Sequence, residues 1–329
     1  MCFGDDGSLD KSQKKCKKYA QEDSRFVVVN KNNGGVDKAR FDGLGHAKGE
    51  FVMFVDSDDW LESNALEKLM RPMLEFETDI VVGQTRNVYH VCGVGLRDWR
   101  KIIPHESNKL ILHDDMMENY YISFFGINLL SVSMWATLYR RSVIHEAKLQ
   151  PSGLSFGEDL VFNMKLMPYV RKYYILDEIV YNYRIDGFGA SSKYLDRWLE
   201  NARLLFEIKM SQIEDLHYTK AIKPQLIEFV NYLKTYVKNC LLYDESNIEE
   251  RKNALKRDSQ KYNFGGKIRA LLTMEYKDKE VIEVLQDNNI DEFFGIMQRR
   301  LLHESLCYRM KHAQTHIRNY FHRDNIEFQ

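Results

Sequence analysis

The chain has 329 residues, with 47 Lys and Arg against 48 Asp and Glu for a net charge of −1, and its five cysteines are scattered without a Cys-x-x-Cys pair. This balance gives no overall reason to expect nucleic acid as a partner, and the cysteines indicate free thiols rather than a zinc site or a disulfide framework. Met1 leads into a lysine-rich run without a signal-peptide pattern, and no apolar stretch reaches the roughly 18–20 residues that span a bilayer, so we expect a cytoplasmic protein of about two domains.

The first fifty residues alternate between helical stretches and short β-rich runs. The pattern predicts a basic helix over residues 10–22, a strand over Arg25–Asn30, a helix over Val36–Ala47 and a strand that begins at Phe51. Strands that alternate with helices of about ten residues favour βαβ units and a parallel sheet. The Gly34–Gly35 pair fits either a plain turn or a close approach of the backbone to a ligand.

The most informative stretch is an apolar strand, Phe51–Val55, that is followed at once by Asp56, Asp58 and Asp59. The carboxyl end of a strand is where open α/β sheets bind their ligands. Carboxylates this close repel one another, and their hard oxygens suit Mg²⁺ or Mn²⁺ shared with a substrate phosphate. The same acids could instead cap and open a helix that is predicted to run to about Phe76, and the two roles are compatible.

A second pair of acids, Glu158 and Asp159, follows Phe156–Gly157 and opens an apolar helical pattern. The helix macrodipole favours acids in a first turn, so stabilisation of the helix end would explain them. A carboxylate held in a cleft at such a position could equally serve as a general base. The residues alone leave both interpretations open. A last β-rich run, Ile175–Tyr183, closes the predicted α/β domain near residue 190.

From about Tyr194 onward, apolar residues recur at intervals of three and four, which predicts helices to the end of the chain. The last segment, Met297–Phe321, combines an apolar face with an arginine-rich face that includes Arg299 and Arg300. Such a helix can lie on an anionic membrane surface or pack on the rest of the protein. The His312/His316 pair is a weak candidate for zinc, because no third ligand is evident.

With both acidic stretches placed, the sequence resembles bacterial glycosyltransferases of family 2, which have the GT-A fold. The matching motifs occur in the family's order, at Asp5–Ser8, Asn33–Arg40, Ala47–Trp60, Trp135–Tyr139, Phe156–Asp159 and Tyr181–Arg184. The resemblance implies a GT-A-like, Rossmann-like α/β domain over residues 1–192, with a mostly parallel sheet flanked by helices. Residues 193–329, which lie outside the resemblance, would form a helical C-terminal domain.

The resemblance also implies roles for single residues. In the family's pattern Asp6 contacts the nucleobase and Asp56 the ribose, Asp58 binds Mn²⁺ or Mg²⁺, and Asp159 is the catalytic base. Arg40 and Glu158 would help to bind the nucleotide-sugar. The implied enzyme is an inverting, metal-dependent transferase that moves a sugar from a nucleotide-sugar to a polysaccharide or lipid-linked oligosaccharide precursor. The resemblance favours a UDP-sugar as the donor.

The sequence departs from the family at several positions. The family's first strand and helix are absent ahead of Asp5, which should expose apolar sheet edges and remove part of the uridine pocket. Asp37, Phe41 and Thr137 stand where the family usually has Ser, Asn and Lys. These departures support one alternative, a non-catalytic truncated remnant or a scaffold of a membrane-associated polysaccharide assembly complex.

Overall fold

A computed structural model describes residues 1–5, 7, 11–30, 33–91, 94–100, 107–185 and 197–303 of the chain. Contacts between Cα atoms divide the chain into two compact units, residues 1–225 and 226–329. The domain boundary expected after residue 192 falls outside the described residues and stays a prediction.

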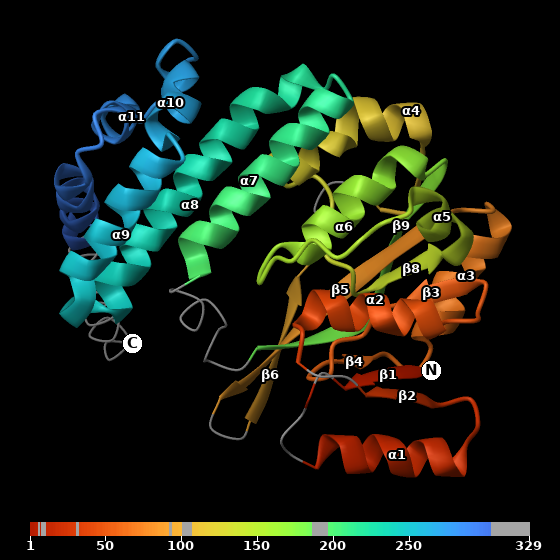
Figure 1. Ribbon diagram of the computed structural model, residues 1–329. Coiled ribbons are helices and arrows are strands. Elements are labelled where there is room, and N and C mark those ends of the chain that lie inside the picture. The colour runs from red at the N-terminus through yellow and green to blue at the C-terminus, as the bar shows by residue number, and fades with distance from the viewer. Residues whose placement is uncertain are drawn as a thin grey trace, which may run out of the picture. The chain divides into compact units, whose positions relative to one another are not determined.

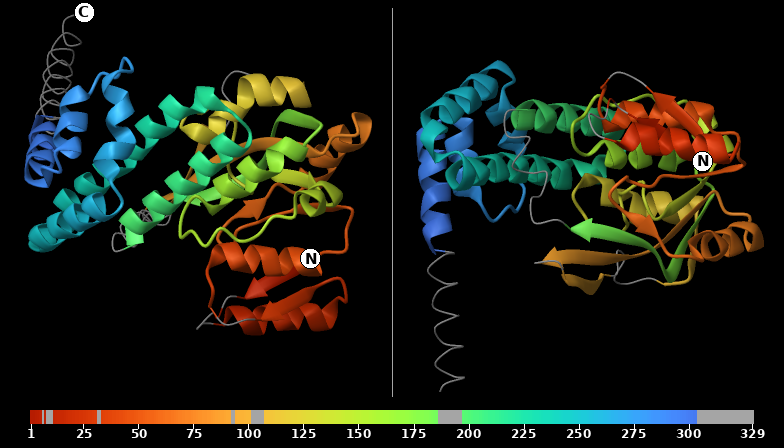
Figure 2. Two further views of the ribbon diagram at one scale, coloured as in Figure 1. Left: turned by 45° about the horizontal axis from the view of Figure 1, so that its top comes forward. Right: turned by 90° about the horizontal axis from the view of Figure 1, so that it is seen from below.

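The N-terminal part of the first unit is a small layered structure. Strands β1 (Cys2–Asp5) and β2 (Val27–Asn30) pair in parallel, as the alternating pattern predicts. Helix α1 (Ser12–Glu22) lies on one side of this pair and helix α2 (Val36–His46) on the other (Figures 1 and 2). Gly35 supplies the positive φ, 87°, from which α2 begins, a conformation that costs glycine little.

A seven-stranded sheet forms the centre of the first unit, in the order β3-β8-β5-β9-β4, with β6 added on β5 and β7 on β9. The strand bounds are β3 Phe51–Met53, β4 Trp60–Leu61, β5 Ile80–Val91, β6 Val94–Arg100, β7 Lys109–Leu112, β8 Thr137–Arg140 and β9 Lys172–Ile185.

The prediction of a mostly parallel sheet needs correction. Among the described strands of the large sheet, β5 and β9 form the parallel pair and the other pairs run antiparallel. Parallel neighbours need a crossover of a dozen or more residues, whereas β5 and β6 are joined as a hairpin. Within the described residues, β3 pairs with β8 alone and β1 with β2 alone, so each of them leaves one edge unpaired.

Helices cover both faces of the large sheet. Leu138 and Tyr139 are consecutive on β8 and therefore point to opposite faces. On the Leu138 face, Leu69 and Met73 of helix α3 (Ala65–Glu75) complete a buried apolar cluster. On the Tyr139 face, Phe162 of helix α6 (Glu158–Leu166) packs edge-on against the tyrosine ring at 5.7 Å.

The helix predicted to follow Asp59 directly begins later. Trp60 and Leu61 form β4, which pairs with Asn182 and Tyr181 of β9, and α3 begins only at Ala65. Its N-cap residue is Asn64, so the acids of residues 56–59 do not cap this helix. The capping alternative for these acids is therefore wrong.

The remaining described helical segments of the first unit are α4 His113–Asp115, a π-turn Met116–Tyr120, a 3₁₀ turn Tyr121–Phe125, α5 Arg141–Ala147, a 3₁₀ turn Met167–Tyr169, α7 Trp198–Asp215, a 3₁₀ turn Thr219–Ala221 and the start of α8 Ile222–Tyr243. No helix of the described residues is long and apolar enough to cross a membrane.

The second unit is helical, as the sequence predicts. After α8 its described elements are a 3₁₀ turn Glu245–Asn247, α9 Ile248–Lys261, α10 Phe264–Ile268, a 3₁₀ turn Arg269–Leu272, α11 Lys279–Gln286 and a helical stretch over 290–303. Two arginines of the predicted basic face form intramolecular ion pairs, Arg299 with Glu292 at 2.7 Å and Arg300 with Asp278 at 2.7 Å. The rest of that face and the His312/His316 pair lie outside the described residues, so membrane contact stays a prediction.

Candidate active site

The residues that follow β3 form an acidic turn, defined here as Asp56–Asp59. The Asp59 amide donates to the Asp56 carbonyl at 3.2 Å, which closes the turn. The three carboxylates have different surroundings: Asp56 and Asp59 are partly buried and Asp58 is exposed. Within the described part of the chain, the Asp58 side chain has no hydrogen-bond or ion-pair partner. Asp58 is therefore the carboxylate of this turn that is available to a ligand.

Arg40, on helix α2, connects the two acidic stretches that the sequence singles out. Its Nη2 donates to Asp56 Oδ1 at 2.8 Å, and its Nη1 donates to Glu158 Oε1 at 2.8 Å. The Arg40 side chain is only 12% exposed, and that of Glu158 11%, so solvent screens this pair weakly. Arg40 thus binds one carboxylate 16 positions away in the chain and another 118 positions away.

Asp159 stands beside this link, in the first turn of α6. Burial, together with the negative charge of Glu158, raises the pKa of Asp159 from 3.8 to about 7, although Arg40 opposes the shift. A carboxylate with a pKa near neutrality can accept a proton at physiological pH and still release it afterwards, which is what a general base requires. The N-cap of α6 is Gly157 at φ 80°. The Asp159 side chain accepts a hydrogen bond from the Leu160 amide at 3.0 Å, so it also stabilises the first turn of the helix, and the two roles predicted for this acid are compatible.

An aromatic cluster places the two acidic stretches next to each other. Phe54 follows β3 and packs edge-on against Phe162 of α6 at 5.8 Å. Phe41 of α2 contacts the same ring at 6.0 Å. The departure at Phe41 therefore has a structural role, because it joins the helix that carries Arg40 to the helix that carries Asp159.

The loop ahead of α6 is anchored by two buried polar side chains. Asp37 Oδ2 accepts hydrogen bonds from the Ser152 amide at 2.6 Å, the Ser152 hydroxyl at 2.8 Å and the Gly153 amide at 3.1 Å. Asn201 of α7 accepts from the Ser155 amide at 2.6 Å and donates to the Phe156 carbonyl at 2.9 Å. These bonds fix the entry of the chain into α6 and hence the position of Asp159.

We expect Asp37→Ala to lower the free energy of unfolding by about 2–3 kcal/mol, because three partly buried hydrogen bonds lose their buried, charged acceptor. Urea denaturation measures this loss. Lys38→Ala on the same helix is the control: Lys38 is exposed, and its substitution should change stability by less than about 0.5 kcal/mol. Equal values for the two variants would contradict the anchoring role.

Of the six residues predicted for the site, the structure brings Arg40, Asp56, Glu158, Asp58 and Asp159 into one region, and Asp6 lies outside the described residues. Sequence reasoning did not assign roles to Asp37, Asn201 or Tyr181. Asn201 could have been noticed as a polar residue on the apolar face of a predicted helix, since it is only 3% exposed. Tyr181 opens the family-like motif Tyr181–Arg184, but this motif does not indicate what the tyrosine hydroxyl does.

A metal ion would have to be held by few protein atoms. Among the described residues, no group of three or more His, Cys, Asp or Glu side chains is arranged to bind a metal. Mg²⁺ is commonly bound through one or two carboxylates together with substrate phosphates and water, rather than by an all-protein cage. The exposed carboxylate of Asp58, beside the partly buried Asp56, suits this kind of shared site.

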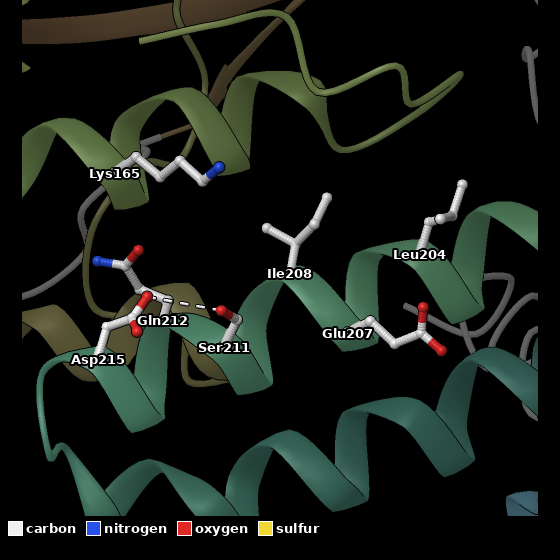
Figure 3. A pocket seen from close by; sticks show the side chains of 7 residues that line it. All are labelled: Lys165, Leu204, Glu207, Ile208, Ser211, Gln212 and Asp215. Carbon is white, nitrogen blue, oxygen red and sulfur yellow. Dashed lines mark hydrogen bonds between the residues drawn. The ribbon is translucent and has the colours of Figure 1, made fainter. Parts of the chain in front are cut away.

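A separate hollow of about 310 Å³ lies between α6 and α7 (Figure 3). Lys165 of α6 faces six residues of α7, which are Leu204, Glu207, Ile208, Ser211, Gln212 and Asp215. Lys165 lies near the end of α6 opposite to Asp159. None of the residues that line the hollow belongs to the acidic turn or is one of the residues predicted for the site.

Comparison with known proteins finds glycosyltransferases that are similar to this chain. Residues 1–146 match the model of "Glycosyl transferase family 2". The chain is 28% identical over 200 residues to "Glycosyltransferase GlyA" of Streptococcus pneumoniae, which covers 59% of this chain and 27% of that protein. It is 26% identical over 228 residues to "Putative glycosyltransferase EpsH" of Bacillus subtilis, which covers 68% of this chain and 63% of that protein. The chain thus spans less than two thirds of either relative.

Among solved structures, the chain is similar to S. aureus TarS residues 1–349 in complex with UDP-GlcNAc. The TM-score is 0.62 at 20% sequence identity, over 92% of this chain and 82% of that one. At this identity the likeness concerns the fold. It confirms the expected GT-A-like architecture of a sheet flanked by helices and followed by a helical region.

Proposed function

Since residues 1–146 match the model of glycosyltransferase family 2, we propose that this chain is an inverting, metal-dependent glycosyltransferase. Its donor would be a nucleotide-sugar, with a UDP-sugar favoured by the ligand of the similar TarS structure. Its acceptor would be a hydroxyl of a polysaccharide or lipid-linked oligosaccharide precursor. The observation that supports this most strongly is that Arg40 binds both Asp56 of the acidic turn and Glu158, the neighbour of Asp159.

In the proposed reaction, the Asp159 carboxylate accepts the proton of the acceptor hydroxyl. The acceptor oxygen forms a bond to the anomeric carbon while the bond from that carbon to the diphosphate oxygen breaks, which inverts the configuration and releases the nucleoside diphosphate. The raised pKa of Asp159 strengthens it as a base. Arg40, the cation beside Asp159, would compensate negative charge that develops on the leaving group.

Asp58 is the proposed protein ligand of Mn²⁺ or Mg²⁺, and Asp56 and Glu158 are proposed to contact the nucleotide-sugar. When bound, the cation would supply positive charge to the diphosphate. Asp56 is already held by Arg40, so it is oriented before the donor arrives. Asp6 is proposed to contact the nucleobase by resemblance alone.

The experiment that tests this function is a calorimetric titration of the full chain with UDP, with and without Mn²⁺. Metal-dependent binding with a dissociation constant on the order of micromolar would support the proposal and justify a screen of UDP-sugars. Absence of binding in both conditions would contradict it, and would favour the alternative of a non-catalytic scaffold.

We expect Asp58→Asn to weaken UDP binding at limiting Mn²⁺ by about tenfold or more, because a neutral amide is a poorer ligand for a hard cation than a carboxylate. Binding without Mn²⁺ should be unchanged. Asp177→Asn is a suitable control, since Asp177 lies on β9 outside the acidic turn. If sugar transfer by Asp58→Asn were normal at limiting Mn²⁺, the metal role of this residue would be wrong.

A further inference from the structure

The hydroxyl of Tyr181, on strand β9, makes hydrogen bonds to both ends of the acidic turn. The Asp56 amide donates to the Tyr181 hydroxyl oxygen at 3.1 Å, and the Tyr181 hydroxyl donates to Asp59 Oδ2 at 2.8 Å. The other oxygen of Asp59 accepts from the Arg184 amide at 2.8 Å. Both ends of the turn are therefore attached to strand β9, and the exposed Ser57 and Asp58 lie between these two points.

Tyr181 is itself held rigidly. Its side chain is fully buried, it belongs to the cluster that α3 forms with the sheet, and its ring stacks on Trp135 at 5.3 Å with an angle of 20° between the rings. Its backbone is paired with Leu61 of β4 and Thr85 of β5. The Tyr181 hydroxyl therefore has little conformational freedom, and its hydrogen bonds fix the acidic turn relative to the sheet.

We infer that Tyr181 is a positioning residue for the donor site: its hydroxyl and the Arg184 amide hold Asp59 as a structural anchor, so that Asp58 is presented as the free carboxylate. This assignment rests on the function proposed above and divides the three acids of the turn by task. Asp56 is bound to Arg40, Asp59 is bound to β9, and Asp58 remains for the ligand. An ordered turn binds its ligand more tightly because less conformational entropy is lost on binding.

The test uses the full chain and compares Tyr181→Phe with Tyr121→Phe. Both substitutions remove one hydroxyl from a fully buried ring. The Tyr121 hydroxyl also makes two hydrogen bonds, to the Met164 carbonyl at 3.0 Å and from Gln212 at 3.1 Å, but it has no contact with the acidic turn. The two variants should therefore lose a similar amount of global stability. Only Tyr181→Phe should change the structure of the acidic turn.

Two measurements are made. The first is hydrogen exchange of the peptide that contains residues 54–60, which needs no ligand. We expect its exchange to accelerate by about tenfold in Tyr181→Phe and to stay unchanged in Tyr121→Phe, because only the former loses the acceptor of the Asp56 amide. The second is Mn²⁺-dependent UDP affinity, which should fall by about five- to twentyfold in Tyr181→Phe alone, in line with the loss of one or two hydrogen bonds. With a donor sugar, KM should rise more than kcat falls.

Unchanged hydrogen exchange in Tyr181→Phe would overturn the inference. If the wild-type chain binds UDP, the inference would also be overturned by a Tyr181→Phe variant whose exchange accelerates but whose UDP affinity equals that of the wild type. If the wild-type chain does not bind UDP, the proposed function fails, and the exchange measurement alone decides whether Tyr181 orders the turn. Asp59→Asn removes the acceptor instead of the donor. Its side-chain amide has only one acceptor oxygen for the two donors, the Tyr181 hydroxyl and the Arg184 amide. It should change exchange and affinity in the same direction as Tyr181→Phe.

Discussion

Replacement of Asp159 by Asn is expected to lower turnover by about 10²–10⁴-fold, the usual contribution of a positioned general base, while donor binding stays within about twofold of the wild type because the isosteric amide preserves the shape of the site. As the proposed base, Asp159 would act in its deprotonated form. Its pKa of about 7 therefore predicts that turnover rises with pH through neutrality. Steady-state rates between pH 5 and pH 9, combined with UDP calorimetry, measure both quantities.

The same variant should be more stable than the wild type, with a pH dependence of known sign. The pKa of Asp159 in the folded state lies above its ordinary value of 3.8. Ionisation of this carboxyl group therefore destabilises the folded state relative to the unfolded state. Stability is lost as the pH rises from about 4 through 7, and Asp159→Asn should exceed the wild type by about 2–4 kcal/mol at pH 8 and by less than about 1 kcal/mol at pH 4. Near-normal turnover with unchanged donor binding would refute the assignment of Asp159 as the base.

Replacement of Arg40 by Met should affect both stability and catalysis. Asp56 and Glu158 would lose their shared partner in a region where Arg40 is only 12% exposed. Loss of one member of a buried ion pair costs about 3–5 kcal/mol. Arg40 also lowers the pKa of Asp159, so its removal should move the acid limb of the pH–rate profile to higher pH. Urea denaturation and the pH–rate profile measure the two effects.

Arg86→Met is the matched control for this variant. Arg86 donates to Glu62 at 2.8 Å, and its side chain is 17% exposed, but the pair lies outside the acidic turn and α6. Its loss should reduce stability without a shift of the pH–rate profile. A profile that is unchanged in Arg40→Met, or shifted equally in both variants, would contradict an electrostatic link from Arg40 to Asp159.

Local signals in the sequence determine a large part of this protein. The apolar run before Asp56 predicts β3, and the periodic apolar residues after Glu158 predict α6, because a strand or helix of this kind depends on neighbouring residues. The resemblance of motifs such as Asn33–Arg40 and Phe156–Asp159 indicates glycosyltransferase family 2, and the match of residues 1–146 to the model of that family supports it. The α/β architecture with a helical end follows from the same signals and is confirmed as well.

Tertiary contacts decided what the sequence left open. The acids at 56–59 could have capped a helix, but pairing of Trp60–Leu61 with β9 delays α3 to Ala65 and leaves these acids in a turn. The mixed direction of the large sheet depends on partners distant in the chain, which a local pattern does not encode.

The division of labour among the acids was decided in the same way. Arg40 is 118 residues from Glu158, and Tyr181 is 122 residues from Asp59. The raised pKa of Asp159 arises from burial that exists only in the folded chain. The sequence by itself thus determined which residues carry charge and where most strands and helices form. The folded structure decided which carboxylates are bound by Arg40 and by β9, which one has a raised pKa, and which one has no partner among the described residues.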